Sequence, residues 1–158
     1  MVRSILVLVL TLLALSARAE PVAPWGVSKS VDYPYAAQRV VFDVTTASAE
    51  EFNDVLGRVS ELNRLYGANP FEMSIVVLIH GNAIPFFTLG KLDGYGPLMA
   101  RAESLAAAGP IEFRMCQLAA RVRYDLLPRD IHGFVTMVPN GDAELIRLQR
   151  EEGYAYMR

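Results

Sequence analysis

The chain has 158 residues, 53% of them hydrophobic and 20% charged, so it is long enough to form one domain with a real core and too apolar to be disordered. Its formal net charge of −2 lacks the basic excess that nucleic-acid binding requires, and we expect no nucleic-acid partner. The single cysteine, Cys116, excludes an internal disulfide, a C-x-x-C dithiol cycle and covalent haem attachment.

Residues 1–19 have the pattern of a signal peptide. Arg3 gives a positive start, the run 4–15 is apolar, and the segment closes with Ala-Arg-Ala, which predicts cleavage after Ala19. An uncleaved anchor is the alternative, but the run is shorter than the roughly 20 apolar residues that span a bilayer. Because Arg3 and Arg18 leave with the segment, the net charge falls from −2 to −4. We therefore expect a periplasmic protein that is free of the membrane after cleavage.

Residues 20–37 contain several prolines and predict an extended N-terminal lead-in to a domain formed by residues 38–158. The aromatic side chains of Trp25, Tyr33 and Tyr35 indicate packing against something, either this domain or a neighbouring subunit. A mobile terminus is the alternative.

The first half of the domain begins with a β-branched and aromatic run, 39–46, which predicts a buried strand. Ser48 and Glu51 form a capping-box pattern, and apolar residues at helical spacing predict a helix that ends at Gly67. The nearly continuous apolar run 73–80 is typical of a central parallel strand that is covered on both faces.

The middle of the domain is less regular. Residues 82–91 are consistent with a short helix or with a loop over the sheet. The segment 92–97 predicts a turn, with Pro97 in the first turn of a helix over 98–109. Residues 110–116 predict a third strand.

The last part of the domain predicts a short helix over 117–124, a loop over 125–133 and a fourth strand over 134–139. A final helix is predicted over 143–157, with Gly153 ending its regular part.

This alternation of strands and helices predicts an α/β fold, a three-layer sandwich with a mostly parallel open sheet and helices on both faces. In such sheets the functional site lies along the edge where the strands end. The residues expected at that edge are Thr45, Thr46, His80, Gly81, Asn82, Cys116, Pro139, Asn140 and Gly141.

Cys116 is expected where the third strand becomes a helix. A helix N-terminus presents free N–H groups and the positive end of the helix dipole, which favour a thiolate over a thiol. A thiolate at an open edge is a nucleophile and a sulfur acceptor. The alternative is a buried cysteine that acts as a small hydrophobic residue.

His80 directly follows the second strand, where it could polarise a ligand, hold an anion or only close the strand through a backbone bond. His132 is a weaker candidate that we expect to orient its loop. We expect no cofactor and no metal, because the chain lacks P-loop and dinucleotide-binding glycine patterns and shows no metal-ligand spacing.

Four stretches, RVVFDVTT, IVVLIHGNAI, IEFRMCQLAAR and IHGFVTMVPNGDAELIRLQREEGYAYM, occur in an order that resembles the DsrE/DsrF-like family of sulfur-relay proteins, and among them the exported single-domain members. The resemblance implies a DsrE-like α/β sandwich and homo- or hetero-oligomers, often trimers or hexamers. It also implies that a cysteine after the third strand, here Cys116, carries sulfane sulfur as a persulfide. The family's histidine–glycine pair corresponds to His80 and Gly81.

These expectations combine into a periplasmic sulfur carrier that uses Cys116, with His80, Gly81, Asn82 and Asn140 as supporting residues. Its partners would be donor and acceptor proteins or small sulfane-sulfur compounds, and the protein would form a homo-oligomer such as a dimer, trimer or hexamer. The alternative is a non-catalytic ligand-binding or assembly subunit with a buried cysteine. A third possibility is metal or redox sensing through Cys116.

Overall fold

The structure is a computed structural model that describes residues 25–158, so the predicted signal peptide 1–19 lies outside the described residues. Residues 25–37 contain no helix or strand, and the side chains of Trp25, Tyr33 and Tyr35 are exposed. The α/β fold is formed by the residues that follow.

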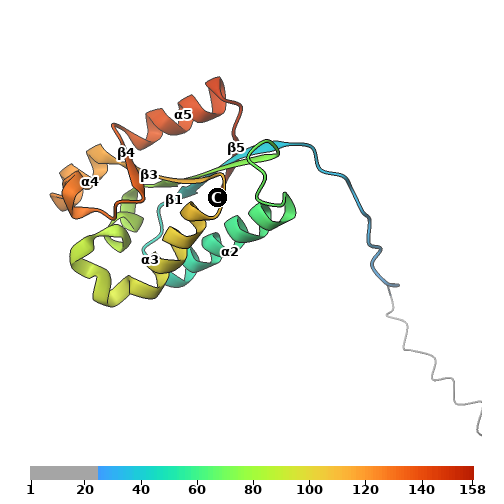
Figure 1. The fold of residues 1–158 in the computed structure, drawn as a ribbon, viewed down its shortest axis with the longest axis horizontal. Helices are drawn as coiled ribbons and strands as arrows, with labels where there is room; N and C mark the ends of the chain where they lie inside the picture. The colour runs from blue at the N-terminus through green and yellow to red at the C-terminus, as the bar shows by residue number, and fades with distance from the viewer. Residues whose placement is uncertain (1–24) are drawn as a thin grey trace, which may run out of the picture. The chain divides into compact units, whose positions relative to one another are not determined.

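The domain is built on a five-stranded sheet in which every pair of neighbouring strands is parallel. The strand order is β4-β3-β2-β1-β5 (Figure 1). The strands are β1 (Gln38–Val44), β2 (Met73–Ile79), β3 (Ile111–Cys116), β4 (Val135–Val138) and β5 (Ala155–Met157).

Helices cover both faces of this sheet. The helix α5 lies on one face, and α2 and α3 lie on the other (Figure 1). The helices are α2 (Ala49–Leu65), α3 (Leu92–Ala107), α4 (Gln117–Tyr124) and α5 (Gly141–Glu151), with short 3-10 helices η2 (Gly81–Phe87), η3 (Leu89–Lys91) and η4 (Pro128–Asp130). The predicted three-layer α/β sandwich is confirmed. Within the described part of the chain, no helix combines the length and apolar content needed to cross a bilayer.

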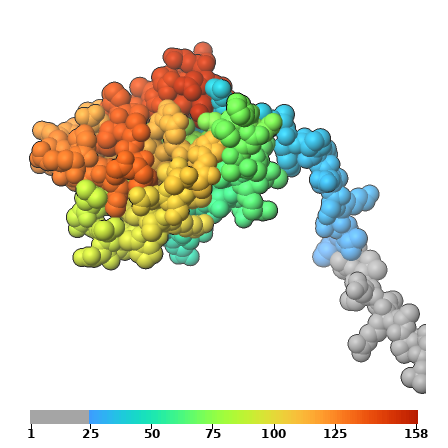
Figure 2. Space-filling view, viewed as in Figure 1, coloured from blue at the N-terminus to red at the C-terminus, as the bar shows by residue number. Residues whose placement is uncertain are grey.

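The central strand β2 is buried on both faces, as its continuous apolar run predicts. Ile75, Val77 and Ile79 join the larger core cluster, which also contains the aromatic residues of α2 and η2. Val76 and Leu78 point to the opposite face and join a smaller cluster beneath α5. Figure 2 shows α5 (red) along the top of the molecule, on that side of the sheet. The α5 face therefore has little apolar core, which leaves room for polar residues at its edge.

The helix α3 begins at Leu92, so the predicted turn over 92–97 is wrong. Pro97 lies inside the helix, where it removes one backbone hydrogen bond. Tyr95 packs edge-on against Phe86 with ring centroids 4.9 Å apart. This packing anchors the first turn to the core and overrides the low helix propensity of Gly94, Gly96 and Pro97.

The final helix ends at Glu151, close to Gly153, where the sequence predicts the end of its regular part. The prediction that the helix continues to residue 157 is wrong. Gly153 adopts a left-handed φ of 73°, which an L side chain rarely adopts, and the chain turns there toward the sheet. Residues 155–157 then form β5, which pairs with β1 as a fifth strand. The position of this strand brings Arg158 next to Asp43, Thr45 and Thr46 at the carboxyl edge of the sheet.

Candidate functional site

Cys116 ends β3 and caps the N-terminus of α4. Its Sγ accepts a hydrogen bond from the backbone N–H of Ala119 at 3.3 Å, which satisfies one of the free amides of the first helical turn. The residue is only 5% exposed. The sulfur therefore lies in the fold rather than on its surface, and access to it depends on the space around it.

A pocket of about 440 Å³ opens beside this sulfur. Its lining residues come from the strand ends, from α4 and from the start of α5, and they are His80, Gly81, Cys116, Leu118, Ala119, Val122, Arg123, Asn140 and Asp142. Three of the four supporting residues predicted from the sequence thus lie around Cys116. The fourth, Asn82, is not among the lining residues, but its Oδ1 accepts a hydrogen bond from Arg123 Nη2 at 3.1 Å.

His80 forms an ion pair with Asp43 of β1, in which Nε2 contacts Oδ1. Both side chains are largely buried, with 18% and 15% exposed. The hydrogen bond to Asp43 raises the pKa of His80 above its usual 6.5, although burial opposes this. Burial also acts against the charge of Asp43, but the bond and the charge of His80 outweigh it and lower the pKa of that carboxyl group. The pair places a readily protonated imidazole in the Cys116 pocket.

Gly141, the first residue of α5, packs directly against Cys116 and His80. A Cβ at this position would lie 3.1 Å from the Cys116 Cβ, 3.6 Å from its Sγ and 3.5 Å from the His80 Cγ. Both functional side chains therefore approach one point on the α5 backbone, and only a residue without a side chain leaves that approach open.

We expect Gly141→Ala to destabilise the fold by about 1–2 kcal/mol, because the added methyl group overpacks the space between Cys116 and His80. The displaced sulfur should also react with iodoacetamide roughly tenfold more slowly. Urea unfolding and the alkylation rate measure the two effects. Gly94→Ala in α3 is the matched control, since its added methyl meets nothing within 4 Å. Equal behaviour of the two variants would contradict this prediction.

Two other predicted site residues have backbone roles. Gly81 has a left-handed φ of 59°, and its carbonyl accepts a hydrogen bond from the Tyr124 hydroxyl at 3.0 Å. Asn140 caps α5, because its Oδ1 accepts from Ala143 N at 3.0 Å. These residues shape the rim of the pocket.

His132 lies apart from this site. Its ring packs near Phe134, with centroids 5.8 Å apart, and its backbone N–H donates to Phe87 O at 3.1 Å. Among residues 25–158, no group of three or more His, Cys, Asp or Glu side chains is placed to hold a metal ion.

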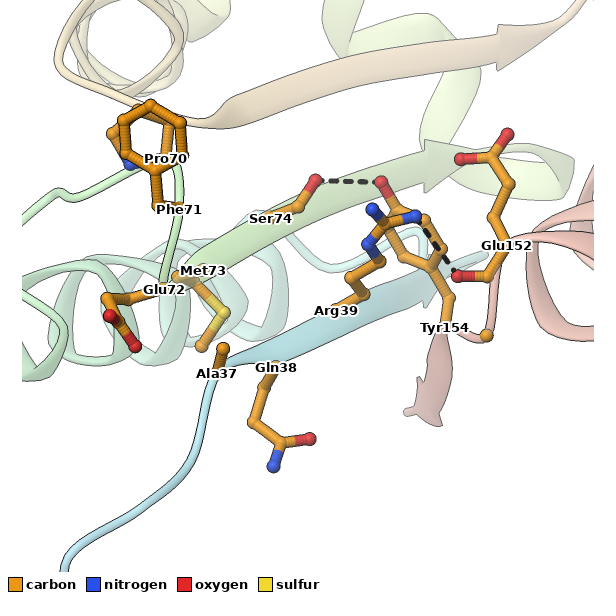
Figure 3. A pocket seen from close by; sticks show the side chains of 11 residues that line it. Ala37, Gln38, Arg39, Pro70, Phe71, Glu72, Met73, Ser74, Glu152 and Tyr154 are labelled. Carbon is orange, nitrogen blue, oxygen red and sulfur yellow. Dashed lines mark hydrogen bonds between the residues drawn. The ribbon is translucent and has the colours of Figure 1, made fainter.

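A larger pocket of about 560 Å³ lies at the other end of β1 and β2 (Figure 3). Its polar groups bond to one another. Ser74 Oγ and the Tyr154 hydroxyl are 2.7 Å apart, and Arg39 Nη1 donates to the Glu152 carbonyl at 3.3 Å. It contains neither a cysteine nor a histidine, so the smaller pocket at Cys116 is the candidate site.

Sequence reasoning missed Asp43 and Tyr156, and it placed Gly141 at this edge without assigning it a role. Asp43 could have been found, because a carboxylate that interrupts the apolar run RVVFDVTT needs a partner once the strand is buried. Tyr156 could not, because its segment was predicted as helix. Its hydroxyl donates to Asp43 Oδ2 at 3.0 Å only because β5 pairs with β1.

The fold and site together define an α/β protein with an all-parallel open sheet and a cysteine–histidine pocket at the carboxyl edge of its strands. No protein-family model matches the chain, and no curated protein matches it. Among solved structures, it is similar to a protein of unknown function, MTH1491, from Methanobacterium thermoautotrophicum. The match has a TM-score of 0.63 and 20% identity, and it covers 77% of this chain and 98% of the other. At this identity the likeness shows the fold alone.

Proposed function

We propose that this protein is a periplasmic sulfur carrier in which Cys116 holds sulfane sulfur as a persulfide. The observation that supports this most is the position of the only thiol. It lies at a helix N-terminus, in a pocket that it shares with His80, and His80 is paired with Asp43. Helix amides and a protonated imidazole both stabilise a sulfur anion. The resemblance to the sulfur-relay family supports the same chemistry.

The transfer needs no cofactor and no external oxidant. The Cys116 thiolate attacks the terminal sulfur of a polysulfide Sₙ²⁻, forms a new S–S bond and releases Sₙ₋₁²⁻, which leaves Cys116–S–S⁻. An acceptor thiolate RS⁻ then attacks the outer sulfur, becomes RS–S⁻ and restores the Cys116 thiolate. Export would require a periplasmic donor and acceptor, and we propose a homo-oligomer as the working form.

Incubation of the native protein with polysulfide tests this function. Intact-protein mass spectrometry should show a gain of about 32 Da, one sulfur atom, which a reducing thiol removes. The gain should be located at Cys116. A native protein that stays at its original mass contradicts the proposal.

The burial of Cys116 favours a second candidate, a non-catalytic ligand-binding or assembly subunit in which the cysteine only fills space. Thiol labelling separates the two candidates. A carrier reacts with iodoacetamide in its native state through the pocket. A space-filling cysteine reacts only after denaturation.

A further inference from the structure

Four side chains from four strands form a row across the carboxyl edge of the sheet. They are Tyr156 on β5, Asp43 on β1, His80 after β2 and Cys116 at the end of β3, which is the order of these strands in space. The register sets the row on a diagonal. Tyr156 pairs with Val41, two residues before Asp43, and Asp43 pairs with Leu78, two residues before His80. His80 is level with Cys116, because Ile79 pairs with Met115. Since side chains alternate along a strand, all four project from the face that α5 covers.

Hydrogen bonds connect the first three members of this row. The Tyr156 hydroxyl donates to Asp43 Oδ2 at 3.0 Å, and Asp43 Oδ1 contacts His80 Nε2. The lowered pKa of Asp43 keeps it ionised near neutral pH, and a carboxylate can only accept. The proton of a neutral His80 is therefore on Nε2, and its Nδ1 carries a lone pair. Within residues 25–158, Nδ1 has no hydrogen-bond partner.

Cys116, the last residue of the row, forms no hydrogen bond with His80. Cys116 and His80 line the same pocket and approach the same point at Gly141. An imidazole with a free lone pair thus lies next to the only thiol of the chain.

We infer that Tyr156 and Asp43 are positioning residues that hold His80 as the proton acceptor for Cys116. The thiol proton passes to His80 Nδ1, which leaves a thiolate and an imidazolium, and the Asp43 carboxylate stabilises the new positive charge. This inference rests on the proposed function, in which the thiolate takes up sulfur. It adds the residues that generate the thiolate.

Charged groups reach this row from every element packed against it. Asp142 of α5 favours the protonated His80, and Arg158 after β5 acts on Asp43. Arg123 of α4 lines the same pocket and lies close to Gly81. The Asp43 contact has the largest effect on His80, which makes Asp43 the residue to test.

Asp43→Asn keeps the shape of the side chain and removes its charge. We expect the NMR titration of the His80 ring to move to lower pH, because the hydrogen bond and charge that raise its pKa are lost. The rate of Cys116 alkylation by iodoacetamide at pH 7 should fall on the order of tenfold or more, with the pH profile moved upward. The inference is overturned if the histidine titration and the alkylation profile both match the wild type.

Tyr156→Phe is a milder test at a residue that is 45% exposed. Loss of one hydrogen bond to Asp43 should slow alkylation about threefold to tenfold. Tyr154→Phe is the matched control, since it removes a hydroxyl bond to Ser74 from the same segment but leaves the row intact. Equal alkylation rates for the two variants would overturn a positioning role for Tyr156.

These tests separate the row from the sulfur chemistry. If the variants behave as expected but the wild type gains no sulfur from polysulfide, the carrier function fails and the row stands. If the wild type gains sulfur and the variants are unchanged, the carrier stands and the row fails. The histidine titration requires no access to the thiol, so it also tests the row in a protein whose cysteine resists alkylation.

Discussion

Cys116→Ser is expected to abolish sulfur uptake from polysulfide completely while the protein remains folded. The chain has no other cysteine, so no second thiol can take over the attack. A serine hydroxyl is a poor nucleophile toward sulfur and forms no persulfide. The comparison between the wild type and this variant is made by intact mass, with the gain of about 32 Da present in one and absent in the other.

The serine variant should fold because Cys116 is a helix cap. Its sulfur accepts from Ala119 N, and a serine Oγ makes the same bond as one of the preferred N-cap groups. We expect a change in the free energy of unfolding of no more than about 1 kcal/mol. If the folded serine variant gains the same mass, Cys116 is not the sulfur site.

Glu144→Gln is expected to destabilise the fold by about 2–3 kcal/mol at pH 7. Glu144 of α5 joins Arg114 of β3, at 2.5 Å, to Arg147, at 2.8 Å, and only 11% of its side chain is exposed. Hydrogen bonds from Arg147 and then from Arg114 hold the pKa of Glu144 at about 2, below the ordinary 4.5, although burial acts in the opposite direction. A shift of this size corresponds to about 3 kcal/mol, and loss of the charge leaves Arg114 without a full partner in a largely buried position.

The same shift predicts the pH dependence. Because the pKa of Glu144 is lower in the folded than in the unfolded chain, its contribution is complete above about pH 4.5 and is lost as the pH falls toward 2. Urea unfolding at pH 7, 4 and 2 should show the difference between the wild type and the glutamine variant shrinking as the pH falls. Glu61→Gln is the matched control, since the exposed Glu61–Arg64 pair should contribute less than about 0.5 kcal/mol. Equal losses in the two variants at pH 7 would show that burial adds nothing to the network.

This network has a second consequence for the α5 side of the sheet. The apolar cluster there is small, so the ion pairs of Arg114 and Glu144 supply part of what holds α5 against β3. The N-terminus of the same helix carries Gly141 and Asn140 to the Cys116 pocket. The position of α5 therefore couples the stability of this layer to the geometry of the site.

Much of the fold was predictable because the signals are local. The apolar run 73–79 is continuous because β2 is buried on both faces, and the α2 stripe repeats at helical spacing because one face meets the core. The prediction was wrong for two segments whose conformation depends on tertiary contacts. Tyr95 holds the glycine- and proline-containing start of α3 in a helix through its contact with Phe86, and β5 forms only by pairing with β1.

The N-terminal cap of α2 was also only partly predictable from the sequence. Ser48 does accept from Glu51 N at 3.2 Å, as the sequence pattern predicts. The Glu51 carboxylate, however, contacts the Thr46 hydroxyl and not the Ser48 amide, which donates to Thr46 Oγ1 at 2.9 Å. A residue just before the helix thus completes the cap in place of the expected reciprocal bond.

The sequence by itself determined the layered α/β architecture and the position of Cys116 between a strand and a helix, because both follow from periodicity within single segments. It also placed His80 and Asn140 after two parallel strands that end at the same edge of the sheet. Only the tertiary structure decided that Cys116 is nearly buried and that Gly141 packs against both Cys116 and His80. It also decided that Asp43 bonds to His80 and that Tyr156 bonds to Asp43. These contacts depend on the order and register of strands far apart in the chain, which no single segment encodes.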